Sequence, residues 1–284
     1  MPEPTRIDPT STILMGLIVV FLIVVAIAVS MYRRSGGRLF LKARRLPLVP
    51  WGLLSALAVM LLYLGLGGIC LVSRDGVDHS LRERLIRLGL MNVALMILIP
   101  PLLRATSGAK LADLGLSTRD LGRQCLLGLT GCALAIPVVY TVQLVTVSIW
   151  TPTDHLVQQA LAADQSLPTA LVAAFGTIVG APVVEEMLFR GFLLASFWKL
   201  AAQQTGERSL RGDFTANLAV SLLFAWVHPW PASIPLFVLS MMLGELYRRS
   251  GSLIATIVMH ACFNGLSMAA LLLAMAFGLL PTPA

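Results

Sequence analysis

Long apolar runs separated by short basic or turn-forming segments make up most of this chain. A helix needs about 20 apolar residues to cross a bilayer, so each run predicts one spanning helix. The pattern therefore predicts an all-α, polytopic integral membrane helix bundle with about eight transmembrane helices. The expected helices lie near residues 12–32, 47–72, 85–103, 124–150, 168–198, 214–228, 233–247 and 252–278.

Two of these runs leave the number of crossings open. The runs at 214–228 and 233–247 are short and are joined by Pro229-Trp230-Pro231. Such a pair can form a hairpin that does not fully cross the bilayer. Seven crossings is the alternative count.

Composition supports a membrane protein and argues against a nucleic-acid partner. The chain has 284 residues, of which 57% are hydrophobic and 12% charged, whereas a soluble domain carries about 25% charged residues. The net charge of +7 comes from basic residues in short loops, where they act as topology signals. We therefore expect the lipid bilayer, and no nucleic acid, as a partner.

The four cysteines predict neither a disulfide framework nor a zinc knot. They lie in or beside apolar runs without a Cys-x-x-Cys pair, so they are interpreted as small hydrophobic residues. They are Cys70, Cys125, Cys132 and Cys262.

The first apolar run has the wrong polarity for a secretion signal. Acidic Glu3 and Asp8 precede it, and Arg33 and Arg34 follow it. A signal peptide has its basic residues before the apolar segment. We expect 12–32 to be a retained first span.

Lysine and arginine in the loops predict the orientation. With the N-terminus outside, fifteen basic residues fall in inner loops and five in outer ones. The longest inner loop, 104–123, divides the chain into N-terminal helices with this loop (1–123) and a catalytic core (124–284). Within the loop, four leucines could form an amphipathic interfacial helix, and a solvated linker is an equal alternative. They are Leu111, Leu114, Leu116 and Leu121.

One turn of the fifth expected helix carries three charges. Glu186 and Arg190 are four residues apart with the acid first, which favours pairing on one helix face. Glu185 points about 100° away and has Phe189 in place of a cation. An unpaired charge at mid-bilayer costs on the order of 2.5–3.5 kcal/mol, so the turn must face protein or water. It predicts a functional site, with a buried ion pair that fixes helix packing as the alternative.

Two further expected helices carry a histidine among apolar residues. Phe224 and His228 are four residues apart on one face, and so are His260 and Asn264. At a rise of 1.5 Å per residue, Glu185 and both histidines lie about 15–20 Å from the inner helix ends. They are therefore expected to converge in one polar cavity. The other histidines, His79 and His155, fall in predicted outer loops.

These residue types suit peptide-bond hydrolysis. A desolvated Glu185 can take a proton from water, and His228 can share that role or protonate the leaving amine. His260 and Asn264 can hold the developing oxyanion. Zinc bound by the histidines and a glutamate is an alternative, and its requirement stays open. The zincin motif His-Glu-x-x-His is absent.

The three motifs together resemble those of the CAAX-protease and bacteriocin-processing family of intramembrane endopeptidases. They are Glu-Glu-x-x-x-Arg, Phe-x-x-x-His and His-x-x-x-Asn, in this order between Pro168 and Ala274. The resemblance implies an all-helical membrane protease whose site opens toward the cytoplasm. Its first glutamate and first histidine would activate water, and its second histidine and asparagine would stabilise the oxyanion. Glu186 and Arg190 would support them, and Phe224 would hold the His228 rotamer.

The substrate expected from this resemblance is a membrane-associated protein or peptide. A prenylated CAAX-like tail is one form of it, but many bacterial relatives lack such a substrate. A proton-coupled transporter and a non-catalytic membrane scaffold are the alternatives from other functional classes. The lack of an inverted repeat argues against the transporter.

Overall fold

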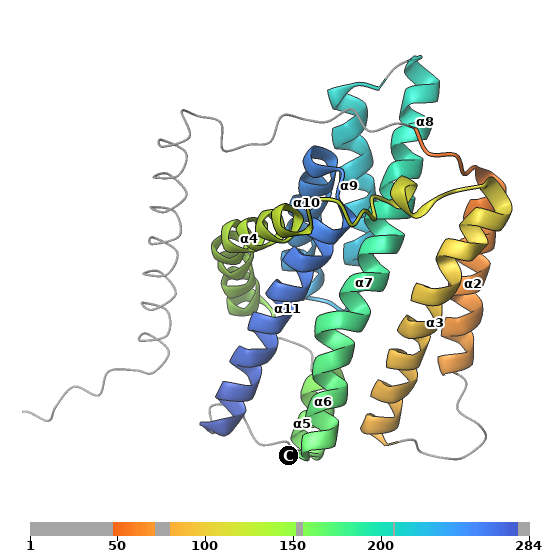
Figure 1. Cartoon of the computed structure of the whole chain (residues 1–284). Helices are drawn as coiled ribbons and strands as arrows, with labels where there is room; N and C mark the ends of the chain where they lie inside the picture. Colours follow the sequence, from red (N-terminus) through yellow and green to blue (C-terminus); the bar gives the residue numbers. More distant parts are fainter. Residues whose placement is uncertain (1–47, 72–79, 152–155, 207, 278–284) are drawn as a thin grey trace, which may run out of the picture.

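The computed structural model describes residues 48–71, 80–151, 156–206 and 208–277. In these ranges all regular secondary structure is helical, as the apolar pattern predicted (Figure 1). The predicted span 12–32 lies outside the described residues, as do His79 and His155.

The N-terminal half of the described chain consists of an antiparallel helix pair and two later helices. α2 (Leu53–Leu71) packs along α3 (Leu81–Ser107), and a short 3-10 turn, η1 (Leu111–Leu114), follows. α4 (Leu121–Ile149) is the next long helix. The sequence pattern missed the short helix α5 (Leu156–Ala163), whose eight residues are too few for a spanning run.

A long central helix runs through the bundle as α6 (Leu167–Phe175), α7 (Ala181–Glu186) and α8 (Ala195–Thr205). Two π-helical stretches join these parts, η2 (Gly176–Gly180) and η3 (Met187–Leu194). A π-turn inserts one extra residue per turn, so it changes which side chains face a neighbouring helix, and such turns are frequent at functional sites. The charged turn lies at the junction of α7 and η3.

The last three helices pack on one side of this central helix. They are α9 (Leu210–Trp226), α10 (Ser233–Ser250) and α11 (Leu253–Ala276). In Figure 1 they stand with α4 to the left of the central helix, and α2 and α3 stand to its right. Contacts of α7 with both α11 and α3 place the charged turn between these two groups.

Four described helices are long and apolar enough to cross a membrane. They are Leu81–Ser107, Leu121–Ile149, Leu167–Gln204 and Leu253–Ala276, and Leu53–Gly68 is a shorter apolar helix. α9 and α10 do not meet this criterion. α9 carries charged residues near its start, and α10 carries them near its end. The all-helical architecture with several long apolar helices is confirmed, and the count of eight crossings stays a prediction.

The bundle is held by apolar contacts between distant segments. The largest core joins α2 and α3 to η3, α8 and α9, with Leu95, Ile99 and Leu194 fully buried. A second core lies between α4, α10 and α11 and includes Cys132. Cys125, Cys132 and Cys262 are free thiols, in agreement with their interpretation as small hydrophobic residues.

The loop 104–123 forms neither a continuous interfacial helix nor a fully solvated linker. Most of its leucines do not line an interfacial helix, because α3 continues to Ser107 and only η1 follows. Leu114 is 1% exposed and belongs to the largest core, so the segment is not a solvated linker either. Gly115, at φ +79°, turns the chain there, and its carbonyl accepts a hydrogen bond from the Leu253 amide at 2.9 Å. Tertiary packing of one leucine thus outweighs the weak local amphipathicity.

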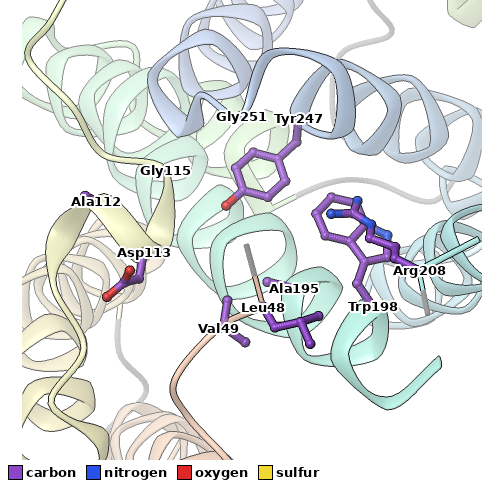
Figure 2. Close-up of a pocket in the computed structure, with 10 residues that line it drawn as sticks. All are labelled: Leu48, Val49, Ala112, Asp113, Gly115, Ala195, Trp198, Arg208, Tyr247 and Gly251. Carbon is purple, nitrogen blue, oxygen red and sulfur yellow. The ribbon is translucent and has the colours of Figure 1, made fainter. Parts of the chain in front are cut away.

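A small crevice lies between the start of the described chain, η1, α8 and the end of α10 (Figure 2). It has a volume of about 50 Å³. The Trp198 and Tyr247 rings stack in its wall at a centroid distance of 5.8 Å, and the Arg208 guanidinium lies 4.1 Å from the Trp198 ring centroid. The residues of this wall join η1, α8 and the end of α10. Their contacts stabilise the end of the central helix beyond the charged turn.

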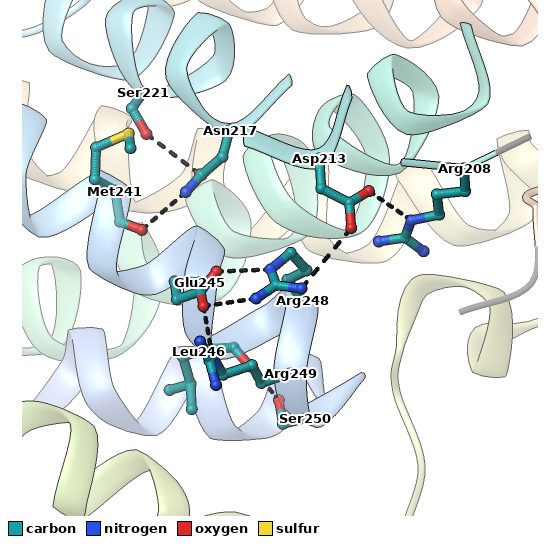
Figure 3. Close-up of polar contacts among 10 residues, drawn as sticks. All are labelled: Arg208, Asp213, Asn217, Ser221, Met241, Glu245, Leu246, Arg248, Arg249 and Ser250. Atoms are coloured by element: carbon teal, nitrogen blue, oxygen red, sulfur yellow. Dashed lines mark hydrogen bonds and ion pairs between the residues drawn. The ribbon is translucent and has the colours of Figure 1, made fainter. Parts of the chain in front are cut away.

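An ion-pair network ties the start of α9 to the end of α10 (Figure 3). Asp213 accepts from Arg208 at 2.6 Å and lies 3.8 Å from Arg248, which also pairs with Glu245 at 2.7 Å. Deeper along the same helices, the Asn217 amide donates to the Met241 carbonyl at 3.0 Å. These contacts fix α10 against α9 and so position the α10 residues that reach the charged turn.

Candidate active site

The Glu186–Arg190 pair is fully buried. Glu186 is 0% and Arg190 1% exposed, and the guanidinium donates to Glu186 Oε1 at 2.8 Å. Arg190 also donates to Ser240 Oγ at 2.8 Å, which connects η3 to α10. The predicted pairing of acid and base along one helix face is confirmed. Removing one partner of a buried ion pair is costly, because the other charge stays buried without compensation. This pair therefore anchors the site.

His260 bridges the two glutamates. Its Nδ1 lies 2.8 Å from Glu186 Oε1, and its Nε2 lies 3.8 Å from Glu185 Oε2. An ionised carboxylate only accepts hydrogen bonds, so Nδ1 carries the proton in this contact and Nε2 faces Glu185. His260 is 2% exposed, and the Glu185 side chain is 25% exposed. Glu186 and His260 therefore form a buried support, and Glu185 keeps a partly open carboxylate.

His228 is fixed by the end of α9. The helix stops at Trp226, and the His228 amide donates to Ala225 rather than to Phe224, so the Phe224 carbonyl lacks its usual helical donor. The His228 ring supplies it, with Nδ1 at 2.6 Å from the Phe224 oxygen. A carbonyl only accepts, so the proton is on Nδ1 and the lone pair of the neutral ring is on Nε2. The predicted helix 214–228 ends at His228, whereas α9 ends two residues earlier, at Trp226.

The Phe224 ring holds both histidines on one surface. Its centroid lies 4.6 Å from that of His228 and 6.0 Å from that of His260. The Arg190 guanidinium lies 4.8 Å from the same ring, and Phe189 meets it edge-on at 5.0 Å. Phe224 is 0% exposed. The predicted contact with His228 is confirmed, and the ring also contacts His260 and Arg190, which sequence spacing did not indicate.

Asn264 completes a π-turn of the central helix. The Ala181 amide donates to Gly176, and Pro182 has no N–H, so neither residue serves the Thr177 carbonyl. Asn264 donates to that carbonyl through Nδ2 at 3.0 Å. One amide hydrogen of Asn264 is thus used to hold the turn that precedes Glu185, and the other stays available to a ligand.

The predicted site residues therefore converge on the junction of α7 and η3. His260 contacts both Glu185 and Glu186, and Glu186 also pairs with Arg190. His228 and His260 both contact the Phe224 ring. Asn264 lies one turn beyond His260. The sequence analysis missed Ser240, Phe189 and Thr177. Ser240 and Thr177 each place a hydroxyl within an apolar run, which is the one signal the sequence carried.

The described residues contain no group of three His, Cys, Asp or Glu side chains arranged to hold a metal ion. Glu186 Oε1 already contacts both Arg190 and His260, and the adjacent guanidinium would repel a cation. Both contacts occupy Glu186 Oε1, so this oxygen is not free to bind a metal ion.

Comparison with protein families gives a match that covers this site. Residues 167–266 match the family described as Type II CAAX prenyl endopeptidase Rce1-like. The matched segment is about a third of the chain and is similar to this family. It begins at the first residue of α6 and includes all three motifs, and the family implies a peptidase. Comparisons with curated proteins and with solved structures gave no match.

Proposed function

We propose that this protein is an intramembrane endopeptidase that hydrolyses a peptide bond of a membrane-associated protein or peptide. The observation that carries the proposal is the position of His260, with Nδ1 at 2.8 Å from Glu186 and Nε2 at 3.8 Å from Glu185. A bundle that used its charges for packing alone would not need a second, partly exposed carboxylate beside this imidazole.

In the proposed reaction, Glu185 and His228 activate water. The partly exposed Glu185 carboxylate accepts a proton from the water, and the free Nε2 of His228 orients it or shares the proton. The proton then passes to the leaving amine as the tetrahedral intermediate collapses. Removing either group is expected to lower the rate by about 100-fold or more, the usual contribution of positioned acid–base groups.

His260 and Asn264 are proposed to stabilise the oxyanion. With Nδ1 bound to Glu186, the His260 ring can donate from Nε2 only as an imidazolium. The second amide hydrogen of Asn264 is a further donor. Each preorganised donor contributes about 3–4 kcal/mol to such a transition state. Glu186 and Arg190 hold His260 and the central helix in place.

A divalent metal is the alternative source of activated water. The arrangement of Glu186 with Arg190 favours a mechanism in which side chains alone activate the water. Cleavage in the presence of a chelator distinguishes the two, because zinc-dependent turnover would fall and return on adding Zn²⁺.

The substrate and orientation are part of the proposal. The name of the matched family points to prenylated CAAX-type tails, and we propose a membrane-associated peptide, prenylated or not, as substrate. The excess of basic residues in the predicted inner loops favours a site that opens toward the cytoplasmic side of the cell membrane.

The test is cleavage by the purified, liposome-reconstituted full chain. Matched peptides with and without a farnesyl group serve as substrates, with and without chelator. Glu185→Gln and His228→Ala are expected to lose at least about 100-fold in kcat/KM with unchanged melting temperature. Asp120→Asn makes the same carboxylate-to-amide change at an exposed position at the start of α4 and should keep full activity.

Three outcomes would contradict the proposal. Full turnover in both site variants would exclude water activation by Glu185 and His228. If the parent protein cleaves nothing and Glu185→Gln lowers the stability, a scaffold would be favoured. If the parent protein carries protons into liposomes and Glu185→Gln abolishes this flux, a transporter would be favoured.

A further inference from the structure

The face of α3 that meets the central helix is apolar except at one position. Leu95, Ile99 and Leu103 lie along this face and are 0% exposed. Asn92 continues the same stripe one turn earlier and is only partly buried. Fully packed contacts between the two helices thus give way to a polar, partly open position at Asn92.

Asn92 lies directly against the turn that precedes Glu185. A Cβ placed on Gly180 would be 3.5 Å from Asn92 Nδ2 and 3.6 Å from Asn92 Cβ. Gly180 ends η2, the turn whose Thr177 carbonyl is held by Asn264 from the opposite side. Two carboxamides from different helices therefore flank one turn of the central helix.

The Asn92 amide makes no hydrogen bond within the described part of the chain. It belongs to a helix apolar enough to cross the membrane. An amide without a partner is costly in such surroundings, and a polar residue of this kind indicates a function unless it has a structural partner. The Asn92 side chain therefore has the position and the unused capacity to bind a ligand.

Tyr63 approaches the same region from α2. Gly67 of α2 faces Met91 of α3, since a Cβ on Gly67 would lie 3.8 Å from the Met91 methyl group. In an antiparallel pair this register places Tyr63 one turn from Asn92. Tyr63 packs on the core that contains Val184 and Leu188, the neighbours of Glu185, and its hydroxyl lies within electrostatic range of the Glu185 carboxylate.

We infer that Asn92 and Tyr63 form a substrate-binding wall opposite His260, in which the Asn92 amide hydrogen-bonds the main chain of the substrate. A carboxamide presents a donor and an acceptor together, which matches one peptide group of an extended segment. Figure 1 shows the central helix with α11 on one side and with α3 and α2 on the other. A peptide at Glu185 would then lie between catalytic groups from α11 and binding groups from α2 and α3. The inference rests on the proposed endopeptidase function.

Steady-state kinetics on the reconstituted full chain test this wall. A lost neutral hydrogen bond is worth about 0.5–1.5 kcal/mol, so Asn92→Leu should raise KM by about 2- to 12-fold with kcat within about twofold. Asn92→Gln keeps the carboxamide and should recover part of the loss. Tyr63→Phe should also lower kcat/KM by about 2- to 12-fold. The matched control is Tyr140→Phe, because the Tyr140 hydroxyl bonds to Ser267 at 2.8 Å, and its kcat/KM should not change.

Substrates with single N-methylated peptide bonds supply a readout that a structural role would not move. Methylation at the contacted peptide group should weaken cleavage by the parent enzyme and add nothing in Asn92→Leu. Asn92→Ser, which is polar but cannot mimic a peptide group, repeats the test if the leucine variant does not fold.

Three results would overturn the inference. The wall is wrong if Asn92→Leu and Asn92→Ser keep the parent KM while Glu185→Gln is inactive, and the proposed function then stands. It is equally wrong if every methylated substrate loses the same factor in the parent and in Asn92→Leu. If the parent protein cleaves none of the peptides, the proposed function fails and the wall fails with it.

Discussion

Breaking the buried Glu186–Arg190 pair from one side should be far more damaging than replacing both charges. Arg190→Met leaves the Glu186 carboxylate at 0% exposure without its cation, and it removes the donor to Ser240. Loss of one member of a buried pair costs about 3–5 kcal/mol, because the remaining charge stays desolvated. We therefore expect Arg190→Met to lose about 3–5 kcal/mol in the free energy of unfolding.

The double variant separates the charge effect from packing. Glu186→Gln with Arg190→Met buries no charge at this turn and keeps a side-chain oxygen that can accept from His260 Nδ1. It should recover about 2 kcal/mol or more of the loss, since the penalty of a lone buried charge is gone. Cleavage should stay low in the double variant, because the ion pair that fixes the central helix beside His260 is gone.

Equilibrium unfolding in mixed detergent micelles, followed by tryptophan fluorescence, measures these differences. Arg249→Met is the matched control: Arg249 is 30% exposed and pairs with Glu245, so the same change should cost less than about 1 kcal/mol. The reasoning is refuted if Arg190→Met is as stable as Arg249→Met, or if the double variant is no more stable than Arg190→Met.

Three further changes test the packing and the loops around the site. Gly244→Ala would place a Cβ 1.8 Å from Asn217 Oδ1, so it should separate α9 from α10 and lower the melting temperature by several degrees in a thermal melt, about 1–3 kcal/mol. Asn264→Leu should lose cleavage and about 1–3 kcal/mol of stability in detergent unfolding, because a π-turn carbonyl is left without a donor. Hydrogen bonds from Thr169 and then Ser166 lower the pKa of the Asp164 carboxyl. These bonds therefore stabilise the folded protein above the ordinary carboxyl pKa, and this stabilisation is lost as the pH falls through the lowered pKa. Thr169→Val should reduce this acid sensitivity in melts across pH, and an unchanged pH profile would contradict it.

Local sequence patterns predicted most of the described helices and the pairing of Glu186 with Arg190. Apolar runs predicted α3, α4 and α11 because hydrophobicity over about 20 residues is a local property. The four-residue spacing of Glu186 and Arg190 predicted their pairing for the same reason. A helical rise of 1.5 Å per residue was enough to expect Glu185 and the two histidines at one depth.

Tertiary structure decided which groups each of these residues contacts. No spacing within a helix could show that His260 of α11 bridges two glutamates of the central helix, or that Ser240 of α10 receives Arg190. Leu114 entered the core instead of lining a membrane surface for the same reason. Such contacts join residues tens of positions apart, and they depend on how helices cross and where π-turns rotate a face. Periodicity along one helix contains no record of either.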